Sequence, residues 1–122
     1  MAANFKQDGK VVQWTNGTGG AIASGQVVKI NKILGVALMA IANGASGPVQ
    51  IEGVFRVPKL SAAVIAMGES LTWDVSGANF DDQLATPATG DVTGPPAVAW
   101  EAAGNGVTTL LVKFTGVPGT VT

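Results

Sequence analysis

Apolar and polar side chains alternate along residues 49–57, which read VQIEGVFRV. From Val49 to Val57 the odd positions are apolar or glycine, and three of the four even positions are polar. Successive side chains of an extended strand point to opposite faces, so this alternation predicts a strand with one buried face. Pro58 is expected to end the strand, because proline cannot donate a hydrogen bond to the ladder.

Other runs of Val, Ile, Thr and Trp lie between glycines and prolines, which is typical of short strands joined by turns. Further strands are expected at 10–15, 26–30, 33–42 and 71–75, with Leu71, Trp73 and Val75 directed inward in the last of them. Asn16 to Gly20 has enough glycine to form a tight turn after the first strand.

A hairpin is predicted near the end of the chain. The strand-like segments 97–103 and 107–114 flank Gly104-Asn105-Gly106. Asn-Gly tolerates the left-handed backbone that a type I′ turn requires at both central positions, so the two segments are expected to pair across such a turn.

Two stretches depart from the strand pattern. Residues 60–67 are predicted to form one short helix that is capped by Ser61 and ended by Gly68, with Leu60, Val64 and Met67 near one face. Residues 76–96 form the longest stretch without a clear pattern and are expected to be a surface excursion.

Taken together, these elements predict an all-β fold, a small β-barrel or β-sandwich with one short helix near 60–67. The 122 residues are expected to form a single β domain, 1–122, because the chain has one domain's length and no repeat or domain boundary is apparent. Residues 1–10 are a candidate N-terminal arm and residues 115–122 a candidate C-terminal tail. Frayed ends are the alternative for both segments.

The charge balance argues against several partners. Seven Lys and Arg stand against eight Asp and Glu, and no basic run could neutralise a row of phosphates, so direct nucleic-acid binding is not expected. The longest apolar run, 33–42, is far shorter than the roughly 18 to 20 residues of a membrane-spanning helix. Residues 1–10 contain Gln, Asp and Lys where a signal peptide would have its apolar core. Neither membrane association nor secretion by this route is expected.

The chain has little charge for its apolar content. Charged residues make up 12% and hydrophobic residues 47%, and the mean hydropathy is +0.37. Such a surface can be covered by other subunits, which favours obligate assembly. A compact β domain with many Ala and Gly on its surface fits the composition as well.

Catalytic chemistry finds little support. The chain has no His and no Cys, which removes Ser-His-Asp, thiolate and Cys-based metal chemistry. Ser46 is better interpreted as a turn residue, and Ser61 near Lys59 lacks the S-x-x-K spacing. The glycine-rich stretch 17–25 has Ile22 where a dinucleotide loop needs glycine, and no G-K-[ST] occurs.

The acidic residues are weak candidates for a metal or catalytic site. Asp81, Asp82 and Asp91 lack calcium-loop spacing and are better explained as a solvated loop. Glu69 and Asp74 are a glycosidase pair only in principle, since their separation in space decides it. We therefore predict a protein that is not an enzyme, with no catalytic residues, no metal site and no cofactor.

Short motifs in a characteristic order and spacing carry a family likeness. They are Ala3-Asn4-Phe5 with Gln7 and Gly9, Ser24-Gly25-Gln26-Val27-Val28, Gly35-Val36-Ala37, Gly47-Pro48-Val49, Gly53-Val54-Phe55 to Val57-Pro58-Lys59, and Met67-Gly68-Glu69 to Trp73-Asp74. With these motifs the chain resembles the phage proteins of the DUF2190 family, which are capsid cement or decoration proteins. The likeness is weakest between Gly77 and Pro95, and Ile30-Asn31 stands where a glycine is expected. A recombinase label also attached to that family is not supported, because the phosphate loop is absent.

The resemblance implies a structural virion protein that binds the outside of the phage head and bridges subunits of the major capsid protein. It also implies a homo-oligomer, with a trimer favoured over a dimer because bridging often uses local threefold positions. Such a protein would be made in the host cytoplasm and end on the outer capsid surface. Several modest contacts then give slow release, since each later contact is intramolecular.

The residues proposed for partner binding lie in the arm and the first strand. Ala2 to Lys10 is extended and mixed in polarity, so it could lie along the capsid or add to an exposed sheet edge. Trp14, Trp73 and Trp100 are candidates for core or subunit contacts. The partner-binding candidates are Asn4, Phe5, Lys6, Gln7 and Trp14. The alternative function is a virion surface module that recognises host glycans through an exposed tryptophan.

Overall fold

The computed structural model describes residues 7–122, and this range contains strands and no helix. Accordingly, no helix in the described range is long and apolar enough to cross a bilayer. The strands are β1 (Val11–Thr15), β2 (Val27–Ile30), β3 (Ile33–Ala37), β4 (Ser46–Gln50), β5 (Glu52–Pro58), β6 (Thr72–Asp74), β7 (Asn79–Asp81), β8 (Val92–Thr93), β9 (Ala97–Ala99), β10 (Thr109–Thr115) and β11 (Thr120–Val121).

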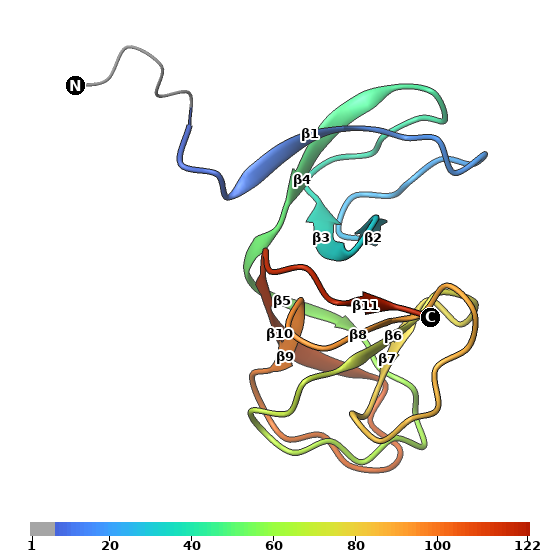
Figure 1. The fold of residues 1–122 in the computed structure, drawn as a ribbon, viewed down its shortest axis with the longest axis vertical. Helices are drawn as coiled ribbons and strands as arrows, with labels where there is room; N and C mark the ends of the chain where they lie inside the picture. Colours follow the sequence, from blue (N-terminus) through green and yellow to red (C-terminus); the bar gives the residue numbers. More distant parts are fainter. Residues whose placement is uncertain (1–6) are drawn as a thin grey trace.

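The strands form three antiparallel sheets. Their orders are β1-β4-β3-β2, β5-β10-β9 and β11-β8-β6-β7. The first sheet makes the upper part of the molecule in Figure 1, and the other two gather below it. The all-β prediction is confirmed.

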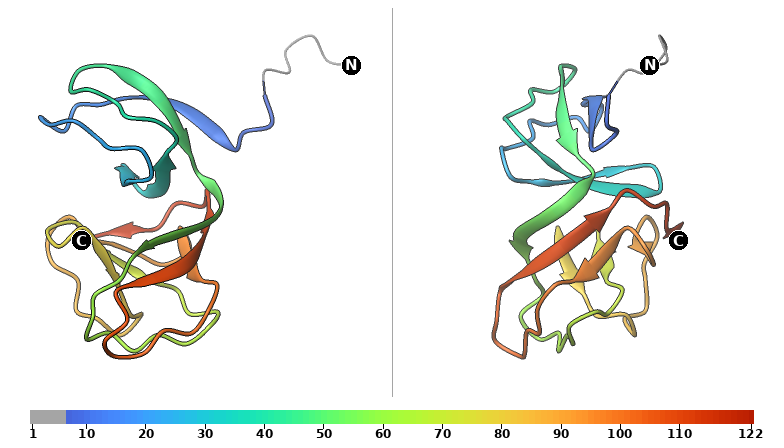
Figure 2. Two further views of the ribbon diagram at one scale, coloured as in Figure 1. Left: turned by 180° about the vertical axis from the view of Figure 1, so that it is seen from behind. Right: turned by 90° about the vertical axis from the view of Figure 1, so that its left-hand side faces the viewer.

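The segment 49–57 is extended as predicted, but its first residues belong to one sheet and its last residues to another. Val49, Ile51 and Val57 are buried, as the alternation requires. The ladder changes partners near Ile51, so that β4 pairs with β1 and β3 while β5 pairs with β10. Figure 2 shows this stretch running from the upper part of the molecule into the lower part. Gly53 has φ +137°, which helps the chain turn between the sheets.

The larger hydrophobic core lies between the two lower sheets. Its aromatic centre is a chain of edge-on contacts, with ring centroids 4.8 Å apart for Trp73 and Phe80 and 6.0 Å apart for Phe80 and Phe114. Aromatic pairs in this geometry stabilise a core beyond the area that they bury. Leu110, Val112 and Phe114 enter this core from alternate positions of β10, which is the period of a strand.

A smaller core lies within the upper sheet and its loops, and the β2–β3 hairpin touches both cores. Val27 packs into the lower core while its neighbour Val28 packs into the upper one. On β3, Leu34 and Val36 belong to the lower core and Ala37 to the upper one. Because neighbouring strand residues face opposite ways, the hairpin is a layer shared by the two cores.

The turn of that hairpin lacks the glycine expected there. Asn31 adopts φ +55° and connects β2 to β3, with Ile30 paired to Ile33. Asparagine tolerates the left-handed conformation better than most residues do. The hairpin therefore closes without glycine.

The predicted helix at 60–67 is wrong. Ala63 and Ile65 are buried while Val64 between them is exposed, so burial across these three residues alternates as in an extended chain. Ile65 exchanges two backbone hydrogen bonds with Ala103, at 2.8 and 3.0 Å. These contacts are with a distant segment of the chain, and a local propensity for helix cannot compete with them.

The stretch 76–96 is more ordered than a surface excursion. It contains β7 and β8, and Phe80 and Val92 from these strands are buried in the lower core. The short length of both strands explains why no alternation was visible. Val75, predicted to point inward, is more than a third exposed, whereas Leu71 and Trp73 are buried as expected.

The hairpin around residues 104–106 pairs as predicted but has a different turn. β9 and β10 are antiparallel, with Ala99 opposite Val112. Gly106 has φ +92°, and Asn105 is not among the residues with positive φ. A type I′ turn needs positive φ at both positions, so this element of the prediction is wrong.

The two ends of the described chain differ. Gln7 to Lys10 are exposed and precede β1. At the other end Thr115 completes β10, β11 pairs with β8, and the Thr122 N–H donates to the Asp91 carbonyl at 3.0 Å. Residues 115–122 therefore lie against the body of the structure.

Lys59 is buried, with 3% of its surface exposed. Its ammonium donates to the carbonyls of Leu60 at 2.8 Å and Ser61 at 3.2 Å. The carbonyl oxygens of Gly104 and Val107 both lie 3.0 Å from the same nitrogen, so four carbonyls share its three N–H groups. One side chain thus joins the 60s loop to the loop before β10, and it occupies two of the carbonyls that a helix would have used.

Replacing Lys59 with methionine should lower the free energy of unfolding by about 2–4 kcal/mol, because four carbonyls lose a charged donor. Urea unfolding followed by tryptophan fluorescence measures the change. The matched control is Lys32→Met, since Lys32 is exposed. An equal, small effect of both substitutions would show that the ammonium cage does not hold the loops.

Replacing Gly35 with alanine should lower the free energy of unfolding by about 1–3 kcal/mol, the usual range for overpacking. A Cβ at this position would lie 2.6 Å from Val49 Cγ1 and 2.7 Å from the Gln50 carbonyl oxygen. The control is Gly104→Ala, where a Cβ meets nothing within 4 Å. Thermal unfolding of both variants tests the close approach of β3 to β4. Equal midpoint temperatures for the two variants would contradict this close approach.

Candidate partner-binding surfaces

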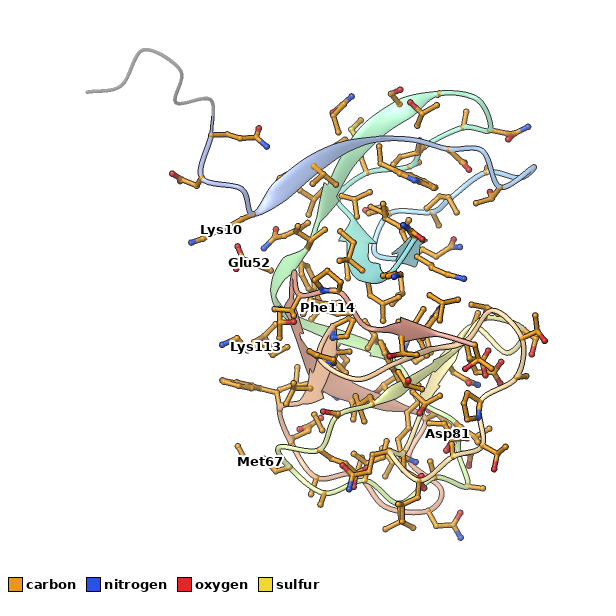
Figure 3. The ribbon with its side chains drawn as sticks, in the orientation of Figure 1. Lys10, Glu52, Met67, Asp81, Lys113 and Phe114 are labelled. Atoms are coloured by element: carbon orange, nitrogen blue, oxygen red, sulfur yellow. The ribbon has the colours of Figure 1, made fainter. Side chains whose placement is uncertain are left out.

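The end of the molecule formed by the 60s, 80s and 100s loops exposes large apolar side chains. Val64 is 65% exposed, Met67 69% and Leu84 87%. Leu60 and Val107 are also exposed. Met67 lies at this lower end in Figure 3, away from β1. We call these five residues the apolar loop end.

Hydrogen bonds between the loops hold the apolar loop end together. The Gly106 N–H donates to the Ser61 carbonyl at 2.8 Å. Glu69 accepts from the Gln83 N–H at 3.3 Å and from the Ala66 N–H at 3.5 Å. The backbone is thus tied between three loops while the apolar side chains remain uncovered, and such exposed groups typically mark an interaction site.

The outer face of the β5–β10–β9 sheet is a second exposed surface. Lys113 lies opposite Val54, and Leu111 lies opposite Arg56. Lys113 Nζ is 5.1 Å from the centroid of the Trp100 ring, and Trp100 is 44% exposed. Figure 3 shows Lys113 on the same side of the molecule as Glu52 and Lys10. We call this surface the Trp100 face.

An ion pair borders the Trp100 face. Arg56 Nη1 lies 3.1 Å from Glu101 Oε1, and the same oxygen accepts the Leu111 N–H at 3.0 Å. Both charged side chains are well exposed, so the pair contributes no more than about 1 kcal/mol. Its main effect is to orient Glu101 beside the sheet.

A groove of about 610 Å³ opens on the side where β2 forms the sheet edge. Ala21, Val27 and Val28 line it from the upper part of the molecule. Pro58, Trp73 and Val75 line it from the lower part. The volume lies within the range of ordinary ligand pockets, and its walls are mainly apolar.

The residues predicted for partner binding are spread over the N-terminal region. Asn4, Phe5 and Lys6 lie outside the described residues. Gln7 is exposed, and its Nε2 donates to the Val11 carbonyl at 2.8 Å. Trp14 is half-buried and packs against the upper core from β1. A role of these residues in binding a partner stays a prediction.

Sequence reasoning did not single out the apolar loop end as a surface. It placed Leu60, Val64 and Met67 together, but on one face of a helix that does not form. The alternation of residues in β10 could have predicted that Lys113 points outward. The position of Lys113 over the Trp100 ring, however, depends on the pairing of β9 with β10. Trp73 is buried, so only Trp100 and half-buried Trp14 remain as glycan platforms.

The side chains of Asp81, Asp82 and Asp91 accept hydrogen bonds from backbone N–H groups. Asp91 accepts the N–H groups of Val75 at 3.1 Å and Ala88 at 2.9 Å. Asp81 and Asp82 each accept an N–H from a following residue. Among residues 7–122, no group of three His, Cys, Asp or Glu side chains is placed to hold a metal ion.

Asp74 caps the turn that follows β6. Its Oδ1 accepts the Ser76 hydroxyl at 2.8 Å, the Gly77 N–H at 3.1 Å and the Ser76 N–H at 3.0 Å. The bonds from the Ser76 hydroxyl and the Gly77 N–H are the main reason that the pKa of Asp74 is lowered from 3.8. The folded state therefore favours the ionised carboxylate.

The comparison with protein families identifies the chain. A family model described as phage cement protein matches residues 6–114 of the 122. The chain belongs to the phage cement protein family. A search of curated proteins found no match. Membership confirms the resemblance that the short motifs carried, and it supports a structural role in association with the phage capsid.

Acid should remove a stabilising contribution of Asp74 from this cement protein. That contribution is complete above the unfolded pKa near 3.8 and is lost as the pH falls through the lower folded pKa. Asp74→Asn keeps an acceptor oxygen but does not titrate, so its free energy of unfolding should fall less steeply than wild type below pH 4. Urea unfolding between pH 3 and pH 7 measures both slopes, and identical slopes would contradict the assignment.

Proposed function

We propose that this cement protein binds the major capsid protein on the outer surface of the phage head and stabilises the head by bridging neighbouring capsid subunits. The family match over residues 6–114 carries the proposal. The bridging acts through surface contacts and without catalysis. The chain works as one domain in a homo-oligomer, for which a trimer fits local threefold positions, and residues 1–10 act as an arm.

The apolar loop end is the surface that meets the capsid in this proposal. Its five large apolar side chains come from loops that are tied to one another, so the surface is held in shape before contact. Two charged side chains bond between these loops, the carboxylate of Glu69 and the ammonium of Lys59, and the ammonium is buried among carbonyls. Docking therefore depends on burial of apolar area, and salt should affect it little.

Several such contacts per oligomer would hold the protein on the head. Once one subunit has docked, the others dock at a high effective concentration, so a modest affinity at each site gives slow release. A capsid lattice offers repeated sites at fixed spacing, which suits an oligomer that presents one loop end per copy. Bridging follows when the copies contact different capsid subunits.

Adding the purified protein to undecorated heads should raise the temperature at which the heads release their DNA. The double variant Val64→Asp, Met67→Asp should bind heads at least about 100-fold more weakly. It replaces two apolar side chains that docking buries with charged ones. Sedimentation of heads with bound protein measures the affinity, at low and at high salt.

Met39→Asp is the matched control, because Met39 is a large apolar side chain, 54% exposed, between β3 and β4, and its replacement leaves the loop end intact. We expect this control to protect heads as wild type does. Full protection by the loop-end variant would refute the assignment of the surface, and no protection by wild-type protein would refute the function itself.

A further inference from the structure

The open edge of β2 and the groove beside it form a site for an extended peptide. β2 is the last strand of its sheet, and the structure gives it no backbone bond to a described segment other than β3. Alternate residues of a strand direct their N–H and C=O groups to opposite edges, so half of those in β2 point away from β3. An edge of this kind pairs readily with another extended chain.

The walls of the groove select the side chains of such a peptide. They are lined by Val27 and Val28 on one side and by Trp73, Val75 and Ala78 on the other. Strand addition combines main-chain hydrogen bonds with pockets for alternate side chains. A groove of about 610 Å³ with these walls suits a strand that carries one large apolar side chain.

The N-terminal segment of the chain has this chemistry. Residues 2–9 read AANFKQDG, in which Phe5 is the one large apolar side chain. In an extended chain Ala3 and Phe5 share a face, while Asn4 and Lys6 share the opposite, polar face. Gly9 has φ +84° and is left out of the pairing segment. Seven extended residues, 2–8, would span roughly 23 Å, which exceeds the length of the four-residue strand β2.

The positions of the arm and the groove favour a neighbouring copy as the donor. The Lys10 carbonyl accepts the Ile51 N–H at 2.8 Å, which fixes where the segment begins. Figure 3 labels Lys10 on the left of the molecule, and Figure 1, in the same orientation, labels β2, β6 and β7 towards the right. The left panel of Figure 2, seen from behind, shows the same separation. An arm that leaves on one side and a groove on the other suit contact between successive copies.

We propose that residues 2–8 of one copy pair with the β2 edge of the next copy and place Phe5 in the groove. The interface joins two different surfaces, so it is heterologous and closes into a ring when the rotation between copies permits. This inference rests on the homo-oligomer of the proposed function, and it names the contact that builds that oligomer.

Cross-linking tests the contact directly, because the chain has no cysteine of its own. One chain carries Ala3→Cys, and a second chain of different tagged mass carries Ala21→Cys at the exposed rim of the groove. After mixing, a short bismaleimide should join the two chains in high yield. The control pairs Ala3→Cys with Val64→Cys, because Val64 is exposed as well but lies on the apolar loop end.

Substitutions test the energy of the contact. Phe5→Ala should weaken self-association roughly 10- to 100-fold, measured by sedimentation equilibrium, since one aromatic side chain leaves an apolar groove. Ala21→Arg should weaken it similarly by obstructing the groove, while Gln13→Arg on an exposed position of β1 should not. Unchanged thermal unfolding of each variant shows that the monomer fold is intact.

A cross-linking yield no higher than in the control, or self-association unaffected by Phe5→Ala, would overturn the inference. A capsid segment found in the groove, or a protein that stays monomeric, would overturn it as well. Head binding separates this result from the proposed function, because a protein that protects heads without the arm contact keeps its cement role. Conversely, a protein that cross-links between copies but does not bind heads would support the arm contact and refute the cement role.

Discussion

The β2–β3 hairpin is the element on which the rest of the structure depends, because both of its faces are buried. Val27, Leu34 and Val36 pack into the lower core, while Val28 and Ala37 pack into the upper core. Two small cores that share a layer must form together, since each supplies one wall of the other. This coupling lets a chain with short strands and no disulfide hold its parts in one arrangement.

The β4–β5 segment and Lys59 depend on that central layer. Because Gly35 has no side chain, Val49 and Gln50 of this segment can pack directly against β3. The chain then enters the lower sheet. Directly after β5, the ammonium of Lys59 forms hydrogen bonds with the backbone carbonyls of four loop residues. A charged group in the interior thus organises the end of the molecule that presents apolar side chains outside. This end differs from an ordinary loop region, because a charged side chain is buried and large apolar side chains are exposed.

For a cement protein, the useful consequence is that the β2 groove is separated from the other exposed surfaces. The apolar loop end borders the Trp100 face, since the Gly68 N–H donates to the Ala99 carbonyl at 2.8 Å. Figure 3 labels Lys113 on the left of the molecule, whereas Figure 1, in the same orientation, labels β2, which lines the groove, towards the right. One surface can therefore meet the capsid while others meet further copies, without competition for the same residues. Contacts distributed in this way are what a bridging protein needs, because the lattice and the oligomer must be engaged at the same time.

The sequence by itself determined the longer alternating strands, the all-β class and the family. Alternation at 49–57, the Asn16 turn and the inward row of β10 are local patterns, and burial follows them because a strand has a period of two whichever partner it finds. Family membership depends on the order of short motifs, which is likewise a property of the sequence.

Only the tertiary structure decided where one strand passes between sheets, and which exposed residues gather into a surface. Residues 60–67 look helical by propensity, yet Ile65 pairs with Ala103 and Lys59 takes the nearby carbonyls. Phe80 and Val92 sit in strands too short to show a pattern, and pairing with β6 buries them. The apolar loop end and the β2 groove each join segments far apart in the chain. Such contacts are non-local, and a pattern read along one segment carries no information about its distant partner.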